Sequence, residues 1–269
     1  MSKLVTPNII LEMIVNDGKQ KSDFKFYEQI LLGILGGIFI GLGAHGCITI
    51  MQNMNAENAG LLKFAGASIF SVGLILIILG GGQLFTGNTL LFLTVLEKKI
   101  TKTTMLKNWF YIYFGNFIGS LILVGIIYYS GLYGHSDHLT LSGALAVKFA
   151  HKKVGLSFIE AFTRGILCNV LVAGAVWLMK GASTFTGKIA ACWFPITCFV
   201  LSGFEHCVAN MYYLPLGKML DSSVSWQNII ISNLVPVTLG NIVGGIFIIG
   251  LGYYYSFNRK NKLEVDQNE

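Results

Sequence analysis

GNFIG at residues 115–119 returns as GNIVG at residues 240–244, and this repeat is the strongest indication of the fold. Both copies lie inside long apolar segments, and each follows an apolar segment that polar residues interrupt. The interruptions read GGGQLFTGN at 80–88 and SGFEHCVAN at 202–210. Two matched halves of this kind are typical of duplicated membrane proteins, whose site lies where the repeats meet on interrupted helices. The two interruptions therefore mark the first candidate site.

Composition supports a membrane protein, since 54% of the 269 residues are hydrophobic and only 12% are charged. The apolar residues gather in blocks, each longer than the roughly 20 residues that cross a bilayer. The six blocks cover about 28–51, 61–96, 108–133, 155–180, 186–214 and 226–256. The second and fifth blocks are overlong because each contains an interruption. We predict an all-α membrane protein with six transmembrane helices.

Three regions follow from these blocks. Residues 1–25 form an N-terminal segment, 26–256 the transmembrane domain with repeats over about 26–134 and 155–256, and 257–269 a tail. The first segment has a weakly amphipathic pattern that suits a helix along the membrane face, and it does not resemble a cleavable signal peptide. The charged tail reads as disordered.

Lysine and arginine set the expected orientation. With six crossings both termini share a side, and that side holds 13 of the basic residues against five on the other, while Arg164 falls inside the fourth block. The excess predicts cytoplasmic termini and a multi-pass protein of the plasma membrane. It also accounts for the net charge of +6, so no nucleic-acid partner is expected. The five cysteines lie in apolar blocks without CxxC spacing, so neither disulfides nor a metal site is expected.

The first interruption contains three consecutive glycines, which disfavour a helix, so we expect the backbone to leave the helical path there. Leu84 and Phe85 are suited to closing a narrow apolar gate, and Thr86 supplies a hydroxyl just beyond it. The alternative interpretation is a glycine-rich packing kink without a pore.

The second interruption places Glu205, His206 and Asn210 at membrane depth. Ionisable side chains are costly there, face the bundle interior and mark a pathway or proton relay. Histidine titrates near neutral pH, so His206 can donate a hydrogen bond to an anion or pass it a proton. The alternative is a hydrogen bond between helices, from His206 to a polar neighbour. The matching position of Thr86 in the first half favours the pathway.

Other polar residues extend the pattern. Asn116 and Asn241 stand in the paired motifs, and Glu160 and Asn169 stand in the fourth block. Contacts through small residues explain the glycines but not the asparagines, which can tie down non-helical loops or line a polar cavity. We favour loop support for most of them. The basic residues at 151–153 would concentrate anions if they lie at a pore mouth, although an ordinary solvated loop would read the same.

Together these motifs resemble the formate/nitrite transporter family over about residues 26–255. The shared phrases are LFTGN (84–88), FGN (114–116), RGILCN (164–169), GFEH (203–206) with ANM (209–211), and PVTLGN (236–241). The resemblance implies an aquaporin-like fold of two inverted three-helix repeats with broken helices two and five. It also implies a homopentamer with one pore in each protomer. Members pass small monovalent anions of weak acids: formate, nitrite, hydrosulfide, acetate or lactate.

The resemblance assigns roles to individual residues. A cytoplasmic constriction would comprise Leu74, Leu84 and Phe85, and an outer one Phe70 and Phe199. Between them lie the matches to the family's threonine and histidine, while Lys153 matches its vestibule lysine. The residues expected along the substrate pathway, including those that support it, are Thr86, Asn88, Lys153, Glu160, Asn169, Glu205, His206, Asn210 and Asn241.

Two motifs point to different substrates. The Thr-Gly-Asn at 86–88 is similar to nitrite, hydrosulfide and lactate members, whereas the Phe-Ile-Glu at 158–160 is similar to formate channels. Formate and nitrite are the first expectations, with the other anions as alternatives.

The expected mechanism is passage with a proton, because an anion between two hydrophobic constrictions loses its water at a cost of several kcal/mol. Lys153 would draw the anion in, and a proton from solvent or from His206 would let it pass as the neutral acid. Anion conduction past a charged His206 is the competing route. A neutral-solute channel would carry paired Asn-Pro-Ala boxes, and a helical metalloenzyme would carry His-Glu-x-x-His; neither motif occurs here. We therefore expect neither an enzyme nor a cofactor, with the small anion, protons and the bilayer as partners.

Overall fold

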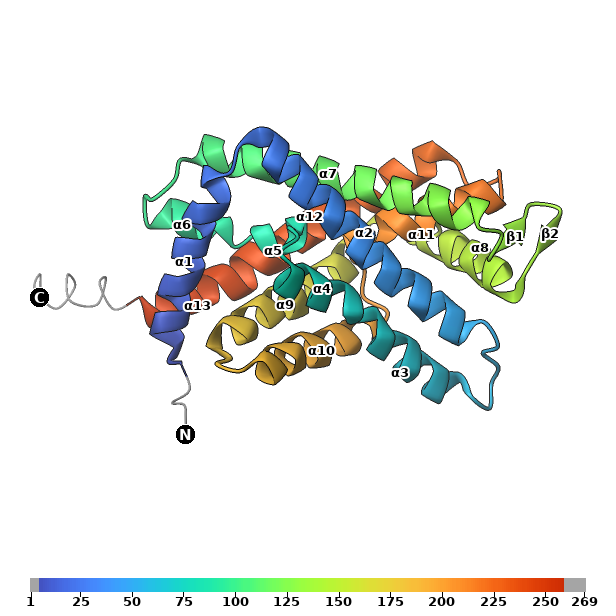
Figure 1. Ribbon diagram of the computed structural model, residues 1–269, viewed down its shortest axis with the longest axis horizontal. Helices are drawn as coiled ribbons and strands as arrows, with labels where there is room; N and C mark the ends of the chain where they lie inside the picture. The colour runs from blue at the N-terminus through green and yellow to red at the C-terminus, as the bar shows by residue number, and fades with distance from the viewer. Residues whose placement is uncertain (1–4, 259–269) are drawn as a thin grey trace, which may run out of the picture.

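The computed structural model describes residues 5–258, most of which lie in helices. Figure 1 shows an elongated helical bundle with α1 and α13 at one end and the short hairpin β1–β2, beside α8, at the other. We name these the α1 end and the α8 end. The predicted tail from residue 259 onward and residues 1–4 lie outside the described residues.

The first half of the bundle contains seven helices, several of them short. They are α1 (Pro7–Asp23), α2 (Phe26–Met51), α3 (Ala59–Phe70), α4 (Val72–Gly80), α5 (Phe85–Asn88), α6 (Leu91–Leu96) and α7 (Lys102–Tyr129). The predicted amphipathic segment corresponds to α1, which buries Ile10, Leu11 and Ile14 against residues of α6, α9 and α13.

The second half repeats this order of long and short pieces. It contains β1 (Gly134–His135), β2 (His138–Leu139), α8 (Leu141–Val154), α9 (Phe158–Gly181), α10 (Phe185–Leu201), α11 (Cys207–Leu220), the π-helical η1 (Asn228–Leu234), α12 (Val235–Val243), the π-helical η2 (Gly244–Gly250) and α13 (Leu251–Phe257). The segment between the third and fourth predicted blocks is therefore not a plain loop. It forms the antiparallel hairpin and then α8, whose N-terminus Thr140 caps by accepting from Gly143 N–H.

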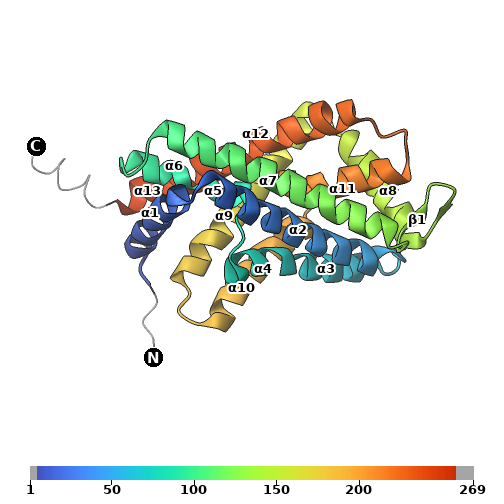
Figure 2. The same ribbon diagram turned by 45° about the horizontal axis from the view of Figure 1, so that its top comes forward.

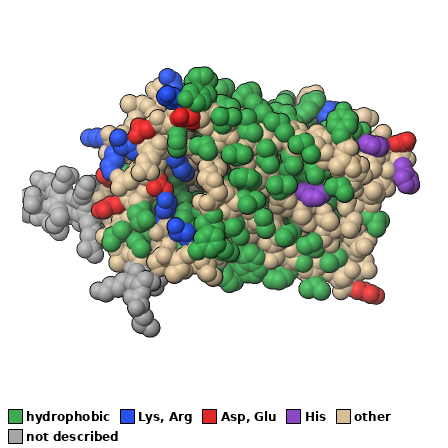
Figure 3. Space-filling model, in the orientation of Figure 1, with side chains coloured by type: hydrophobic (Ala, Val, Ile, Leu, Met, Phe, Trp, Pro, Cys, Tyr) green, Lys and Arg blue, Asp and Glu red, His purple; other side chains and the backbone are tan. Residues whose placement is uncertain are grey.

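Among the described residues, five helical stretches are long and apolar enough to cross a membrane. They correspond to the first, second, third, fourth and sixth predicted blocks. The fifth block is divided between α10 and α11, and neither reaches that length alone. In Figure 3 hydrophobic side chains cover the middle of the visible face, while most of the visible charged residues lie toward the α1 end.

Both predicted interruptions leave the helical path. In the first, α4 ends at Gly80, Gly81 adopts a left-handed conformation with φ of 96°, and α5 begins at Phe85. In the second, α10 ends at Leu201, Gly203 has φ of 72°, and α11 begins after His206. Only glycine adopts such φ values without strain, so each break is encoded by a glycine at the end of its first helix.

The repeated GNxxG motifs hold pairs of long helices together. Figure 2 shows α2 running beside α7, and α9 packs against α12 in the second half. A Cβ atom on Gly115 would lie 2.7 Å from the carbonyl oxygen of Ile30, and one on Gly240 would overlap that of Phe162. Glycine at both positions therefore lets the helix backbones touch, which brings the neighbouring asparagines close to the breaks.

Candidate functional site

The predicted hydroxyl and imidazole meet where two short helices begin. Thr86 is the second residue of α5, and His206 directly precedes α11. Thr86 Oγ1 lies 2.9 Å from His206 Nε2, and the two residues are 0% and 2% exposed. The two interruptions, far apart in the sequence, thus converge on one buried contact.

His206 also caps α11, and this fixes its hydrogen-bonding roles. The backbone N–H of Ala209 donates to His206 Nδ1 at 3.0 Å. A nitrogen that accepts a hydrogen bond carries no proton, so the neutral ring holds its proton on Nε2 and donates it to Thr86 Oγ1. A second proton on Nδ1 would break the cap and place a positive charge at the positive end of the helix dipole. The geometry therefore favours a neutral His206.

Asn116 ties the first break to two neighbouring segments. Its Oδ1 accepts from the N–H of Phe85 at 3.0 Å, and its Nδ2 donates to the carbonyls of Gly33 at 2.7 Å and Gln83 at 2.9 Å. Backbone groups that the break frees from helical pairing are satisfied in this way. The amide of Asn116 thus replaces the missing helical bonds.

Asn241 makes the same three bonds at the second break. Its Oδ1 accepts from Cys207 N–H at 3.0 Å, and its Nδ2 donates to the carbonyls of Gly165 at 2.8 Å and Glu205 at 3.0 Å. The backbone N–H of Gln83 donates to Leu32 O, and that of Glu205 donates to Arg164 O. The hydrogen-bond framework of the two halves is therefore duplicated, residue for residue.

A second layer of amides repeats as well. Asn88 Nδ2 donates to Gln83 Oε1 at 2.9 Å and to Asn108 Oδ1 at 2.9 Å. In the other half Asn210 Nδ2 donates to Glu205 Oε2 at 2.7 Å and to Asn233 Oδ1 at 2.6 Å. The two layers differ at one position: Gln83 of the first layer is an amide, and the equivalent Glu205 of the second layer is a carboxylate.

One lysine contacts each layer. Lys21 Nζ donates to Asn88 Oδ1 at 2.9 Å, and Lys153 Nζ donates to Glu205 Oε1 at 2.9 Å. The Lys153 and Glu205 side chains are only 16% and 6% exposed, so this ion pair is largely shielded from water. Burial lowers the pKa of Lys21 to about 8, although the charge of Asp17 acts in the opposite direction.

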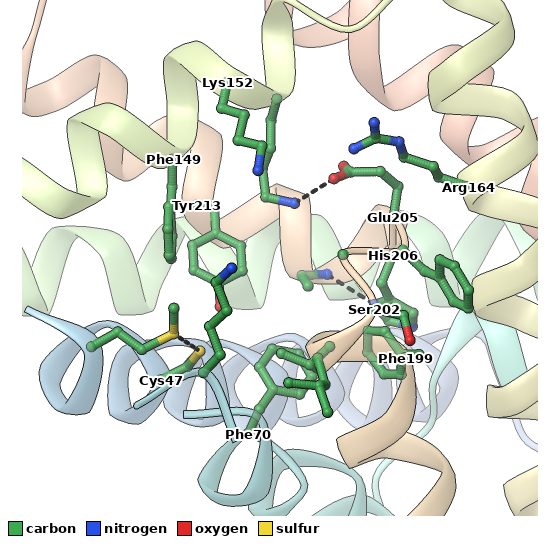
Figure 4. Close-up of a pocket in the computed structure, with 18 of the residues that line it drawn as sticks. Cys47, Phe70, Phe149, Lys152, Arg164, Phe199, Ser202, Glu205, His206 and Tyr213 are labelled. Carbon is green, nitrogen blue, oxygen red and sulfur yellow. Dashed lines mark hydrogen bonds and ion pairs between the residues drawn. The ribbon is translucent and has the colours of Figure 1, made fainter. Parts of the chain in front are cut away.

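A cavity of about 600 Å³ opens from the α8 end and reaches the site. Figure 4 shows that Glu205, His206, Phe70 and Phe199 lie around it, with Lys152 and Arg164 toward one side. We call it the α8 cavity. Its lining includes His206 but not Thr86, so the cavity stops at the imidazole.

Aromatic and aliphatic side chains close the space around the Thr86–His206 contact. The rings of Phe70 and Phe199 meet edge to face with centroids 5.6 Å apart, and Phe199 stacks on His206 at 5.8 Å. Leu74, Leu84 and Phe85 are also buried, and Phe85 packs against Tyr113 with centroids 4.9 Å apart. The residues expected to form the two constrictions thus all lie in the buried interior.

Asn169 joins the two halves behind the site. Its Nδ2 donates to Thr86 O at 3.2 Å and to Asn241 O at 2.6 Å, and it also reaches Thr89 Oγ1 at 3.2 Å. The side chain therefore fixes the backbone that carries the Thr86 hydroxyl. This is a supporting contact and not part of the cavity lining.

Glu160 is the one expected site residue that the structure does not bring into this cluster. It is exposed at the start of α9, where its carboxylate accepts from the N–H of Ser157 and Ser157 Oγ accepts from the N–H of Glu160. These reciprocal bonds form a capping box. The S-x-x-E spacing predicts such a box, so the sequence carried a signal for this role.

The hydrogen-bond network around the breaks also contains Lys21, Asn108 and Asn233, which were not predicted as site residues. Repeat matching could have found them, because Asn108 and Asn233 each stand eight residues before Asn116 and Asn241. Lys21 and Lys153 likewise stand twelve residues before Gly33 and Gly165. Within residues 5–258, no three His, Cys, Asp or Glu side chains are arranged to hold a metal ion.

Comparison with known proteins identifies the family of this chain. The family described as formate/nitrite transporter matches residues 8–255. The formate channel BtFdhC of Bacillus thuringiensis is 35% identical over 256 residues, which cover 95% of this chain and 96% of that protein. The formate channel FocA of Haemophilus influenzae is 34% identical over 272 residues, covering 94% of this chain and 95% of its own length.

Solved structures show the same fold. A pentameric formate channel with formate bound has a TM-score of 0.75 and 33% identity, covering 86% of this chain and 97% of that one. An ion channel of the FNT family has a TM-score of 0.84 and 25% identity, covering 92% and 98%. This chain is therefore a membrane protein that belongs to the formate/nitrite transporter family.

Proposed function

We propose that this protein is a channel for small monovalent anions of weak acids, with formate as its first substrate. The relatives named as formate channels support formate. Nitrite is the second candidate, favoured by the Thr-Gly-Asn of the first interruption. Hydrosulfide, acetate and lactate rank below both.

The proposed architecture is two inverted repeats of three helices with six membrane crossings. The second crossing comprises α3 to α6 and the fifth α10 and α11, each broken at the site. The excess of basic residues supports cytoplasmic termini, and with them an α8 cavity on the outer side of the plasma membrane. A homopentamer follows from the likeness to a channel that is described as pentameric.

The observation that carries the proposal is the contact between Thr86 and His206, 2.9 Å apart in a buried, largely apolar setting. Ionisable residues at membrane depth mark substrate or proton pathways. The α8 cavity leads directly to this imidazole. A purely structural histidine would not need to stand at the closed end of a cavity that Lys153 lines.

Passage requires that the substrate lose its charge. An anion squeezed between Phe70 and Phe199 would lose its water at a cost of several kcal/mol without a buried cation to offset it. Lys153 draws the anion into the α8 cavity, where a proton from solvent converts it to the neutral acid. The acid then enters as the two aromatic rings part.

His206 acts as a hydrogen-bond donor and not as a cation. Its Nδ1 is held by the cap of α11, so Nε2–H is the group that meets the substrate oxygen. The hydroxyl of Thr86, which accepts from Nε2 in the closed site, can donate to a second oxygen. A positively charged His206 would instead trap the anion and break its own cap.

The test is a flux panel with the purified protein in liposomes. Uptake of formate, nitrite, hydrosulfide, acetate and lactate is measured at about pH 6 and about pH 8, with and without an inward proton gradient. We expect formate to enter fastest and the gradient to accelerate it. Protein-free liposomes serve as the control for leakage of neutral acids.

Swelling assays separate the remaining function classes. Vesicles in isosmotic ammonium formate should swell quickly, while those in glycerol should behave like protein-free vesicles. Equal swelling in both would indicate a neutral-solute channel, and formate uptake that ignores the proton gradient would contradict the coupled mechanism.

A further inference from the structure

We infer that the α8 cavity also binds short dicarboxylates, whose two negative charges span its lysines, and that they block the channel because they cannot pass the site. This inference rests on the proposed function for the block, but not for the binding. It starts from side chains that the Thr86–His206 mechanism leaves unused.

The lining of the α8 cavity carries an excess of positive charge. Five cationic side chains line the cavity, Lys63, Lys148, Lys152, Lys153 and Arg164, against the single carboxylate of Glu205. That carboxylate is already engaged by Lys153, Asn210 and Asn233. A cavity so unbalanced attracts more negative charge than one monovalent anion supplies.

These cations differ in whether a carboxylate lies close to them. Within residues 5–258, no carboxylate lies within ion-pair distance of Lys63, Lys148 or Lys152. Arg164 differs, because it interacts electrostatically with Glu160 one turn earlier on α9. Three lysines are thus available to a ligand that needs more than one positive charge.

The three lysines reach the cavity from two helices. Lys148 and Lys152 stand four residues apart on α8 and therefore lie on one face of that helix, one turn from each other. Lys63 comes from α3, so the cations approach from two different elements. In Figure 4 Lys152 and Glu205, which pairs with Lys153, both lie toward the top of the view. A ligand with two separated charges can therefore contact lysines of both α3 and α8.

The size of the α8 cavity and its apolar walls favour a ligand that contains methylene groups. A volume of about 600 Å³ falls in the usual range of small-molecule sites, and it far exceeds what a formate ion fills. The walls between the cations are apolar and include Phe149, Leu145 and Tyr213. Methylene groups between two carboxylates would pack there, which favours a dicarboxylate over a compact inorganic dianion.

A dicarboxylate bound in the α8 cavity is not expected to pass the Thr86–His206 site. Both of its carboxylates would have to be desolvated, each at a substantial free-energy cost, and two protons would be needed to neutralise it. Beyond the cavity it meets the Phe70–Phe199 pair and a His206 that geometry keeps neutral. A bound dicarboxylate would therefore occupy the entrance that formate must use.

Binding is tested first, without transport. Isothermal titration of the purified protein at constant ionic strength compares succinate and malonate with acetate and sulfate. We expect the dicarboxylates to bind at least about tenfold more tightly than acetate and more tightly than sulfate. The double variant Lys148→Gln/Lys152→Gln should lose most of this preference, as judged on protein that elutes and melts like the parent.

A matched double variant controls for net charge. Lys102 and Lys107 are exposed lysines of α7 that do not line the cavity, so Lys102→Gln/Lys107→Gln should bind succinate like the parent. Equal affinity for succinate and acetate would overturn the inference. A preference that both double variants weaken alike would also overturn it, because the effect would then follow net charge.

Flux measurements then test the block. Succinate on both sides of the vesicles should raise the apparent KM for formate without lowering the maximal rate, and radiolabelled succinate should not enter. Rapid succinate entry would refute the block. Specific succinate binding by a protein that passes no formate would leave the binding inference standing and reject the proposed function, and formate flux without succinate binding would do the reverse.

Discussion

The two helix breaks share one framework and differ in what stands on it. Asn116 and Asn241 make the same three bonds, and Asn88 and Asn210 the same two. On this frame Leu84 corresponds to His206 and Thr86 corresponds to Val208, so Thr86 is not the repeat counterpart of His206 that the sequence suggested. The lesson is that asparagines set the shape of the site, while the chemistry depends on a few asymmetric substitutions.

The lysines show the same asymmetry. Lys153 pairs with a carboxylate at 2.9 Å, whereas Lys21 donates to the amide oxygen of Asn88. The α8 end therefore holds a neutralised ion pair beneath free lysines, whereas at the α1 end Lys21 contacts an amide and the nearby Lys180 pairs with Asp17. Substitutions in the shared asparagines and at the two lysines therefore separate the common framework from this difference.

The largest effect is expected from removing a framework amide. Asn116→Leu and Asn241→Leu each remove three hydrogen bonds and leave two buried backbone groups of the break without this partner, at roughly 1–3 kcal/mol for each group. We expect each variant to lose at least about 2 kcal/mol of stability, or to fail to assemble. Thermal unfolding in detergent, followed by size-exclusion chromatography, measures this loss.

The control is Asn228→Leu, because Asn228 is an exposed asparagine at the start of η1. It should change the melting temperature little. If only one of the two framework variants were destabilised, the equivalence of the breaks would be wrong.

A smaller effect separates the lysines. Lys153→Met leaves the nearly buried carboxylate of Glu205 without its cation, and breaking such pairs costs up to about 3–5 kcal/mol. Lys21→Met removes one hydrogen bond to an amide, worth about 1 kcal/mol. We expect Lys153→Met to melt well below Lys21→Met, and the opposite order would refute the distinction.

The pH dependence of Lys21 is the next smaller effect. Its pKa is lowered to about 8, so between about pH 8 and its ordinary value of 10.5 the unfolded chain binds more protons than the folded one. Stability from this group therefore rises with pH across that window and is lost as pH falls through about 8.

Melting curves of the parent and Lys21→Met over this window measure the effect. The parent should gain on the variant by about 1–3 °C toward high pH, and parallel curves would show that Lys21 is not partly buried in solution.

The smallest effect concerns the surface of α8. His151 Nε2 lies 2.8 Å from Asp221 Oδ2. This hydrogen bond, together with one from the backbone N–H of Ser223, lowers the pKa of Asp221 to about 2. Its contribution is present above the ordinary pKa of 3.8 and is lost as pH falls toward 2. Asp221→Asn should cost less than about 1 kcal/mol near neutral pH, because the pair is exposed. A larger loss would mean that this pair positions Lys153.

Much of the fold could be predicted because its signals are local. Three glycines and a Glu-His pair inside apolar blocks located both breaks, and the repeated GNxxG motif identified the supporting asparagines. Such features follow from backbone sterics and from the cost of polar groups in lipid, which act on short stretches.

Other features could not be predicted, because they depend on what the folded chain brings together. The segment 141–154 carries three lysines and no apolar block, so nothing in its hydropathy distinguished α8 from a loop. The contact of Lys21 with Asn88 depends on how α1 docks. Glu160 differs for another reason: family likeness suggested a role in supporting the site, while its Ser157-x-x-Glu160 spacing indicated the capping box in which the structure holds it.

The most direct test of the central claim compares three variants at the Thr86–His206 contact. His206→Asn keeps an N-cap residue while removing the Nε2 donor, Thr86→Val removes the hydroxyl at constant shape, and Thr86→Ser retains it. In liposomes with an inward proton gradient, His206→Asn should lower formate uptake at least about tenfold, Thr86→Val less, and Thr86→Ser little. Parental uptake with unchanged pH dependence in folded His206→Asn would contradict the account.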